Sequence, residues 1–398
     1  MSPRRVLATV LAVIGVLGVF VGGVIVGGHA QATGLTELSD PVRGVLLGDS
    51  GQDLSGQVLD LLKDQYYVPV DSQKLQSTSV DAMVAALKDP YTDYLSPDEL
   101  EALRERNDGT YYGVGLQVAE REGAVVIAGV FADSPAAKAK ARTGDVIVSV
   151  DGASTTGQDL STVVGKIRGK EGTTVKIGLR TGDAPPRVLT LERSRIKVPA
   201  VTSRIITADG KKIGYVRLAA FTRGAGDALR AAVKDLRAKG AEALVFDLRG
   251  DPGGLVTEAV NVAGVFLPDG SEVVVTQGEH SPRHVYKTHA EPVAGDLPVI
   301  VLVDEGSASA SEIVAGALRD SKRGVLVGQR TFGKALVQST IPLRNGGALK
   351  LTTARYLTPS GYDLAKRGLP PAVKVLDDPA TKPDEALQRG LGLAAARA

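Results

Sequence analysis

Three serines and one glutamate lie in the segment Gly306–Glu312, which follows an apolar run and precedes a helix-like pattern. A side chain at such a junction faces the positive end of a helix, where a developing negative charge is stabilised. Small neighbouring residues would let a substrate backbone approach closely. Ser309 is therefore a candidate nucleophile. The same residue also fits a capping box with Glu312, in which the serine only closes the helix N-terminus, and the segment alone leaves both interpretations open.

A serine nucleophile needs a base, and histidine is the usual one. Of the four histidines, His29 lies beside the N-terminal apolar run, and the other three share one polar stretch, at His280, His284 and His289. Their spacing fits no strong metal-ligand motif, so we expect an exposed connector there. The sequence predicts no metal and no other cofactor, and it supports a Ser-His-Asp triad poorly.

Lys334 is the alternative base. An ordinary lysine has a pKa of ~10.4, so only about one side chain in 2500 is neutral at pH 7. Lowering that pKa to ~7–8 requires desolvation amounting to ~3–5 kcal/mol. We expect the neighbouring Phe332, Leu336 and Val337 to supply apolar cover. Gln338 is a candidate for orienting the amine, although a solvated glutamine fits the spacing equally well.

The turn Asp251-Pro252-Gly253-Gly254 follows an apolar strand pattern and precedes a helix pattern. Free N–H groups at such a turn can bind a developing oxyanion. We expect the N–H of Gly254 to form one half of an oxyanion hole and the N–H of Ala310 to form the other. A plain strand-to-helix turn is the alternative.

One motif points elsewhere. The pattern Gly328-x4-Gly333-Lys334 nearly spells a phosphate-binding loop, but Ala335 stands where a Ser or Thr would hold magnesium. The acidic pair after the preceding strand also comes before the loop instead of after it. The sequence therefore disfavours nucleotide hydrolysis.

The composition sets the outer limits. The chain has 398 residues, 43% of them hydrophobic and 23% charged, enough for a sizeable core in two or three domains. The net charge of +2 makes no electrostatic case for a nucleic-acid partner. The absence of cysteine excludes disulfides, thiolate metal sites and a cysteine nucleophile.

The N-terminus predicts export. Arg4 and Arg5 precede an uncharged apolar run over residues 6–28, which is long enough to cross a bilayer, since ~20 helical residues suffice. The arginines favour a cytoplasmic N-terminus. We expect a single-pass anchor in the cell membrane with the remaining domains outside the cytoplasm. Cleavage near Ala32, which would release a secreted protein, is the alternative.

Periodicity divides the rest of the chain. After the cytoplasmic stub and anchor helix (residues 1–28), residues 29–50 resemble a linker and 51–108 have a helical pattern. Short strands punctuated by glycine fill residues 109–195. Apolar strands alternate with helices over 196–376, as in an α/β layer structure. Residues 377–398 form a polar tail, helix-prone at best.

Taken together and in order, several motifs resemble one family, the C-terminal processing (tail-specific) serine peptidases. The resemblance runs from about Leu54 to Val375, and the individually weak motifs are specific as a set. The segments that carry it are Lys88–Leu95, Tyr112–Leu116, Ser134–Ala137, Gly144–Gly152, Asp247–Gly254, Gly306–Leu318, Thr331–Gln338, Leu351–Ala354 and Thr358–Gly361.

The resemblance implies an α/β catalytic core with crotonase- or Clp-protease-like layers and an inserted β-rich PDZ domain. It implies that Ser309 is the nucleophile, Lys334 the base and Gln338 an assisting residue. It also implies that a loop in the PDZ domain captures protein substrates by their exposed C-termini, through Gly113, Val114, Gly115 and Leu116. The helical N-terminal segment could form a homo-oligomer. A catalytically silent PDZ scaffold that binds peptides without cutting them is the alternative function.

Three positions depart from the family pattern. Asp251 stands where the family commonly has asparagine, which adds charge beside the expected oxyanion hole. Ala335 replaces a usual glycine, and Pro371-Ala372 stands where Pro-Asp is expected. None of these changes removes an expected catalytic group.

Overall fold

The structure is a computed structural model that describes residues 50–71, 75, 80–376 and 384–398. The expected membrane anchor and most of the linker lie outside the described residues. Within the described part of the chain, no helix has the length and apolar character needed to span a membrane.

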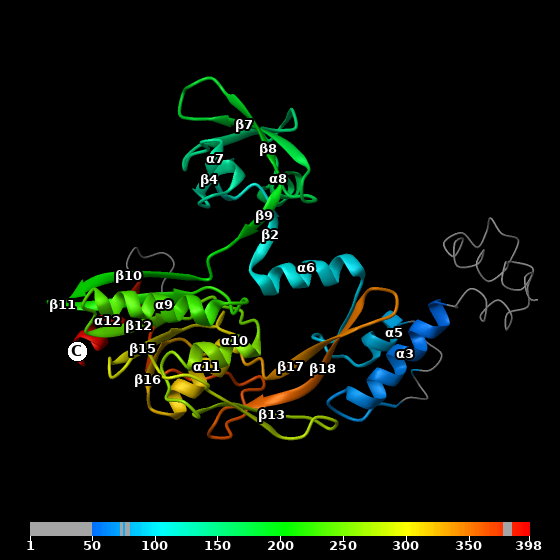
Figure 1. The fold of residues 1–398 in the computed structure, drawn as a ribbon, viewed down its shortest axis with the longest axis vertical. Helices are drawn as coiled ribbons and strands as arrows, with labels where there is room; N and C mark the ends of the chain where they lie inside the picture. The colour runs from blue at the N-terminus through cyan, green and yellow to red at the C-terminus, as the bar shows by residue number, and fades with distance from the viewer. Residues whose placement is uncertain (1–49, 72–74, 76–79, 377–383) are drawn as a thin grey trace, which may run out of the picture. The chain divides into compact units, whose positions relative to one another are not determined.

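The chain forms two compact units (Figure 1). One contains the described residues up to Leu100 together with residues 278–281 and 338–354. The other contains residues 101–277, 282–337 and 355–398. Residues from the second half of the chain thus belong with the N-terminal helical segment, which no local sequence pattern indicates.

The first unit packs two helices against strands. Helices α3 (Ser50–Gln65) and α5 (Val80–Ala86) precede the short strand β1 (Asp93–Leu95). Strand β1 pairs antiparallel with residues 348–350 of β18 (Ala348–Leu357), which also pairs with β17 (Leu336–Pro342). Apolar residues of both helices and of β18 share one buried cluster that includes Val58, Leu62, Met83, Leu349 and Leu351.

Residues 110–197 of the second unit form the β-rich module expected from the glycine-punctuated strands. Its main sheet has the strand order β3-β4-β5-β7-β8, β6 pairs with β5, and β2 pairs with β9. Helix α6 (Pro97–Asp108) precedes it. The elements are β2 (Thr110–Gly113), β3 (Leu116–Arg121), β4 (Ala124–Val130), α7 (Pro135–Lys138), β5 (Val146–Val150), β6 (Ala153–Ser154), α8 (Leu160–Ile167), β7 (Thr174–Arg180), β8 (Arg187–Glu192) and β9 (Ser194–Lys197).

The rest of the second unit is an α/β core around a six-stranded sheet of order β10-β11-β12-β15-β16-β19. Five of its strands run parallel, namely β11, β12, β15, β16 and β19, and β10 pairs antiparallel with β11 at one edge. The elements are β10 (Val201–Ala208), β11 (Lys211–Leu218), α9 (Ala225–Ala238), β12 (Ala243–Asp247), α10 (Val256–Ala263), β15 (Val299–Val303), α11 (Ala310–Asp320), β16 (Gly324–Gly328), β19 (Val373–Lys374) and α12 (Glu385–Ala395).

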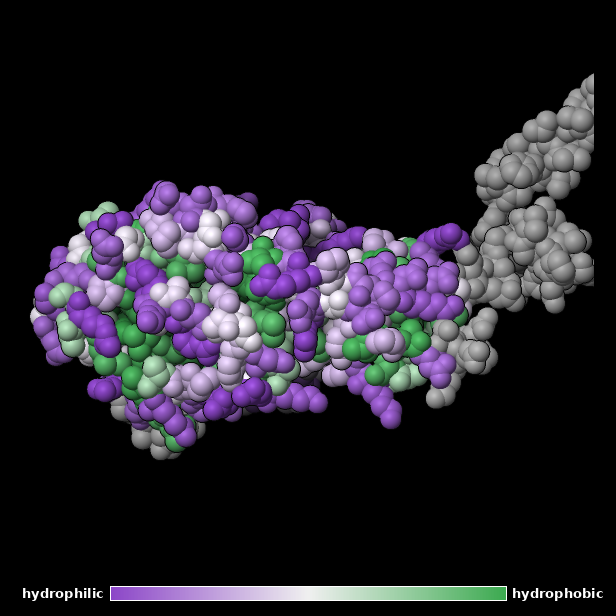
Figure 2. Space-filling view, turned by 90° about the horizontal axis from the view of Figure 1, so that it is seen from below, coloured by the Kyte–Doolittle hydropathy of each residue, from purple (hydrophilic) through white to green (hydrophobic). Residues whose placement is uncertain are grey.

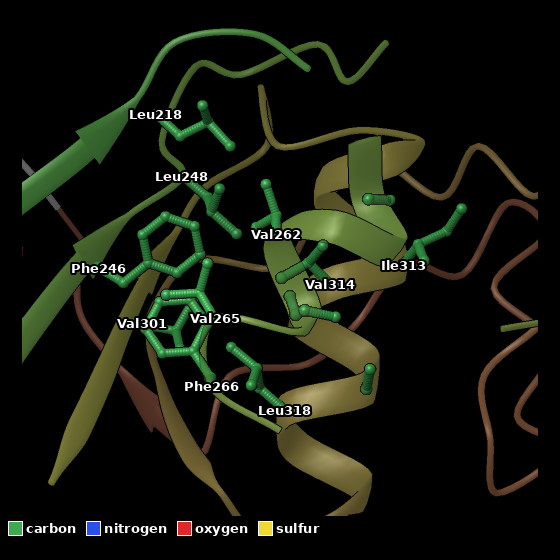
Figure 3. Close-up of a cluster of buried hydrophobic side chains, with 14 of the residues drawn as sticks. Leu218, Phe246, Leu248, Val262, Val265, Phe266, Val301, Ile313, Val314 and Leu318 are labelled. Atoms are coloured by element: carbon green, nitrogen blue, oxygen red, sulfur yellow. The ribbon is translucent and has the colours of Figure 1, made fainter. Parts of the chain in front are cut away.

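The central strands are buried on both faces, which explains their continuous apolar sequence. Every residue of β12 and β15 is buried. Because successive side chains of a strand point to opposite faces, alternate residues join two different clusters. Phe246 and Val301 pack with helices α9, α10 and α11, whereas Val245 and Ile300 pack with α12. Figure 3 shows the first cluster, with side chains from the sheet and from α10 and α11 filling one interior.

Two segments differ from the sequence analysis. The C-terminal segment was expected to be a polar tail, but its last part is helix α12, whose Ala394 is fully buried against the sheet. His284 is exposed, as expected, but it does not lie in a connector: it begins strand β14 (His284–Lys287), which pairs with β13 (Glu272–Gln277). Residues 355–357 of β18 pair with β13 on its other side. Tertiary pairing, which local sequence does not encode, decides both cases.

Figure 2 shows apolar residues on one face of the molecule as separate green patches among hydrophilic side chains. That face therefore carries no single continuous apolar surface that would indicate a large docking site.

Candidate active site

The loop between β15 and α11 places Ser309 at the N-cap of a helix. Its backbone lies at φ 56° and ψ −114°, in a left-handed region that non-glycine residues rarely occupy. Ser309 is half-buried, and its neighbours Ala308 and Ala310 are buried. A strained backbone of this kind persists only where the surroundings hold it in place, and such positions cluster at functional sites.

The carboxylate of Glu312 is one of the groups that hold it. Glu312 is fully buried, and its Oε2 accepts the backbone N–H of Ser309 at 3.0 Å and that of Lys334 at 2.9 Å. Its Oε1 accepts the N–H of Gly333 at 2.8 Å and the hydroxyl of Thr331 at 2.5 Å. The backbones of Ser309 and Lys334 therefore lie within two hydrogen-bond lengths of each other.

Burial raises the pKa of Glu312, and the four hydrogen bonds counteract that effect. Both carboxyl oxygens face donors only, which is the arrangement of an ionised carboxylate. The capping-box prediction is thus borne out for the glutamate, but the same side chain also fixes the loop that carries Lys334. The two interpretations of this segment are compatible.

Tyr356, on β18, also forms hydrogen bonds to both of these segments. Its hydroxyl lies 3.1 Å from the carbonyl oxygen of Ser309 and also bonds to the carbonyl oxygen of Lys334. The tyrosine is almost fully buried, at 1% exposure. Nothing in the sequence analysis singled it out, because its partners lie 47 and 22 residues away.

Lys334 is half-buried in the loop that leads from β16 into β17. Of the three residues expected to cover its amine, Leu336 and Val337 are half-buried and Phe332 is 58% exposed. The apolar cover of the amine stays a prediction. The loop leads into a strand and not into a helix, so it lacks the helix N-terminus that a phosphate-binding loop uses.

The glycine turn after β12 lies directly against the nucleophile segment. A Cβ added to Gly253 would lie 2.9 Å from the Cβ of Ser309 and 2.8 Å from the nitrogen of Ala310, so only glycine fits. Gly254 follows at the surface. Within the described residues, neither the N–H of Gly254 nor that of Ala310 donates to a backbone or side-chain acceptor. Two open donors therefore lie in the glycine turn and at the start of α11, and their expected role as an oxyanion hole stays a prediction.

Asp251 begins this turn and is fully buried. Its Oδ1 accepts the N–H of Gly253 at 2.8 Å, and its backbone carbonyl accepts the hydroxyl of Ser311 at 2.9 Å. Burial raises the pKa of Asp251 to about 7, against the lowering effects of the Gly253 N–H, the Ser311 hydroxyl and Arg217. A carboxylic acid thus takes part in the turn.

Gln338 lies in the other compact unit, on β17, where its Nε2 donates to the hydroxyl of Thr352 at 3.4 Å. The structure gives it a partner within its own unit. Its expected role beside Lys334 stays a prediction.

The β-rich module holds a groove of about 250 Å³ between β3 and α8. Val114 and Leu116 from the expected binding loop line it, whereas Gly113 and Gly115 do not. The other lining residues are mostly apolar, with Arg168 at one side: Tyr111, Gln117, Val118, Phe131, Val164 and Ile167. Gly115 has φ 84°, and a Cβ there would overlap the side chain of Ser134, so this loop also requires glycine.

The histidine stretch forms no site. Across residues 50–71, 75, 80–376 and 384–398, no group of three or more His, Asp or Glu side chains is placed to hold a metal ion. His284 instead packs edge-on against Tyr286, with ring centroids 4.5 Å apart.

A strained serine at a helix N-terminus, a lysine loop bonded to the same carboxylate and two open N–H donors form a candidate active site on an α/β core. Comparison with known proteins supports a serine peptidase. Residues 212–375 match the model of peptidase family S41, residues 126–181 match the PDZ domain, and residues 33–99 match the N-terminal domain of the activating protease CtpB.

Individual relatives point the same way. The carboxy-terminal processing protease CtpA of Bacillus subtilis is 34% identical over 82% of this chain and 69% of its own length. The carboxy-terminal-processing protease of Bartonella bacilliformis is 38% identical over 80% of this chain and 74% of its own length. The solved structure of the photosystem II D1 C-terminal processing protease is 33% identical, with a TM-score of 0.56 over 86% of this chain and 98% of that one.

The chain belongs to family S41, as a C-terminal processing serine peptidase with a PDZ domain. It spans 62% to 75% of the length of four of the curated relatives that it matches.

Proposed function

We propose that this protein is a membrane-anchored endopeptidase that cuts protein substrates outside the cytoplasm, with Ser309 as nucleophile and Lys334 as general base. The observation that carries the proposal is the shared attachment of both residues. Glu312 and Tyr356 each bond to the backbone of Ser309 and to that of Lys334. A lysine side chain is long enough to reach a hydroxyl from a neighbouring backbone.

The chemistry follows in two steps. Neutral Lys334 takes the proton of the Ser309 hydroxyl while Oγ attacks the substrate carbonyl carbon. The carbonyl oxygen becomes an oxyanion, which the N–H groups of Gly254 and Ala310 stabilise. Protonated Lys334 then gives its proton to the departing amine as the C–N bond breaks. In the second step, Lys334 takes a proton from water as the water oxygen attacks the acyl carbon, the ester C–O bond to Ser309 then breaks, and protonated Lys334 returns the proton to Oγ of Ser309, which restores both residues. In this scheme Gln338 holds the amine of Lys334 in position.

Substrate selection is assigned to the PDZ groove. An extended C-terminal segment would add as a strand beside β3, with its last side chain in the apolar groove and its carboxylate at the loop Gly113–Leu116. The open groove and its apolar lining support this assignment. The uncharged run over residues 6–28, preceded by two arginines, supports the membrane anchor and the placement of the peptidase outside the cytoplasm.

The test uses the full chain, purified in detergent, and one unstructured polypeptide with either a free or an amidated C-terminus. Wild type is expected to cut the free form faster, and Ser309→Ala and Lys334→Ala are each expected to fold but not to cut. Circular dichroism of each variant checks the fold. Retained cleavage in Lys334→Ala would show that the base is another group. Binding of the free form without cleavage by wild type would favour the silent-scaffold alternative.

A further inference from the structure

The turn beside Ser309 contains a buried aspartate with one carboxyl oxygen that no hydrogen bond compensates in the described part of the chain. Asp251 is fully buried, and its Oδ2 has no hydrogen-bond partner within the described residues. Its Oδ1 accepts the N–H of Gly253 at 2.8 Å. An ionised oxygen buried without a partner is far more costly than a neutral one.

This acid is built into the active site. The backbone carbonyl of Asp251 accepts the N–H of Ala308 at 3.0 Å and the hydroxyl of Ser311 at 2.9 Å, so the turn is bonded to both sides of the nucleophile. Gly253, which Asp251 holds through Oδ1, packs against Ser309. A charge on Asp251 would thus arise two residues before Gly253 and three before Gly254.

The surrounding elements offer little compensation. From β11, Arg217 acts on the carboxyl, but its guanidinium also donates to the carbonyl of Arg249 at 3.3 Å. From α11, the nearest group is the neutral hydroxyl of Ser311, and Glu312 on the same helix is itself an acid occupied by four donors. Two further acids flank the turn. Asp247 on β12 is paired with Arg249, and Asp304 after β15 accepts the N–H of Gly250 at 2.8 Å.

We propose that Asp251 is a positioning residue whose neutral, protonated form keeps the oxyanion turn competent, so that its ionisation switches turnover down as the pH rises. The proposal rests on the proposed function, because it concerns the oxyanion formed on attack by Ser309. A negative charge in the turn opposes the negative charge that develops on the substrate oxygen.

The two titrating groups then act in opposite directions. Activity rises with pH as Lys334 loses its proton and falls as Asp251 loses its own. Because burial raises the pKa of Asp251 to about 7, the descending limb is expected around neutral pH. Asp251→Asn keeps the acceptor for Gly253 and the shape of the side chain, but it cannot ionise.

The first experiment compares the pH dependence of kcat/KM for wild type and Asp251→Asn, with the full chain in detergent and the free-C-terminus substrate. The ratio of variant to wild type is expected to grow about tenfold between pH 6 and pH 8, as one ionisation with a pKa near 7 requires. Asp320→Asn is the matched control. Asp320 lies at the other end of α11 with its pKa held below the usual range, so its removal should leave the descending limb in place. Parallel profiles for wild type and Asp251→Asn would overturn the proposal.

The second experiment does not depend on catalysis. A buried acid with a raised pKa stabilises the fold fully only below the ordinary aspartate pKa, and that stability is lost as the pH rises toward the raised value. In a Ser309→Ala background, the Tm of the protein with Asp251 is therefore expected to fall relative to that with Asn between about pH 4 and pH 7 and then to run parallel. A constant Tm difference would overturn the proposal even in an active enzyme. A pH-dependent Tm difference without any cleavage by wild type would overturn the proposed function and with it the catalytic role of Asp251.

Discussion

The carboxylate of Glu312 offers the sharpest test of how the site is assembled. Glu312→Gln keeps the size and shape of the side chain but replaces one of its two oxygens with an NH2 group. All four groups that face the carboxylate are donors, two on each oxygen. The oxygen of the Thr331 hydroxyl, which accepts the N–H of Leu369 at 2.7 Å, could accept a second hydrogen bond from the amide, but its own O–H would then lose the acceptor that Glu312 provides. Either orientation of the amide therefore leaves two buried donors without an acceptor.

Each buried donor left without an acceptor costs about 1–3 kcal/mol, so Glu312→Gln should lower the free energy of unfolding by about 2–6 kcal/mol. In one orientation of the amide, the backbone N–H groups of Ser309 and Lys334 lose their shared acceptor. In the other orientation, the N–H of Gly333 and the hydroxyl of Thr331 lose theirs. We expect kcat to fall at least tenfold under conditions where the variant is fully folded, since about 1.4 kcal/mol of lost transition-state stabilisation suffices. Urea unfolding and single-turnover cleavage measure the two effects.

Glu258→Gln is the matched control. Glu258 is also a buried glutamate in the first turn of a helix, and its two oxygens accept only the N–H groups of Gly224 and Gly226. One mismatch instead of two predicts a loss of about 1–3 kcal/mol, with kcat of the folded enzyme preserved. The reasoning is refuted if Glu312→Gln unfolds at the wild-type urea concentration and cuts at the wild-type rate, or if Glu258→Gln loses as much kcat as Glu312→Gln does.

Three further predictions follow from the geometry. Gly253→Ala should reduce kcat by about a hundredfold or more, because its φ is 94° and the new Cβ would lie 2.7 Å from the carbonyl oxygen of Ala308; steady-state kinetics on the folded variant would show it, and a wild-type kcat would contradict it. Arg249→Ala should cost about 3–5 kcal/mol, because it leaves the fully buried carboxylate of Asp247 unpaired; thermal or urea unfolding measures this, and a loss under 1 kcal/mol would contradict it. Gly115→Ala should weaken binding of a peptide with a free C-terminus at the PDZ groove while kcat at saturation is kept; titration by fluorescence anisotropy with the amidated peptide as control tests this, and unchanged affinity would contradict it.

Much of the core could be predicted because local sequence decided it. The apolar runs of β12 and β15 have the length and composition of strands covered on both sides, and both strands lie where the runs predicted. The junction at Ser309 was also visible, since a strand pattern, small residues and a helix pattern follow one another within a few positions. The glycines of the turn at residues 251–254 could be predicted for the same reason.

What escaped prediction depends on contacts between distant parts of the chain. Tyr356 has no local signal, because its role comes from two carbonyl oxygens supplied by other segments. The capping pattern revealed one of the partners of Glu312 and concealed the other three. Helix α12 is short and its leucines and alanines are spread among glycines and polar residues, so their packing against the sheet becomes apparent only in the structure.

Three of the four donors on Glu312 are the backbone amides of Ser309, Gly333 and Lys334, so a single side chain protects all three from hydrogen exchange. Hydrogen exchange at these three positions then requires the same opening event, although they lie up to 25 residues apart in sequence. Their exchange rates should converge, and a ligand that slows one of them should slow all three. Order in the nucleophile segment and order in the lysine loop are thus a single cooperative property.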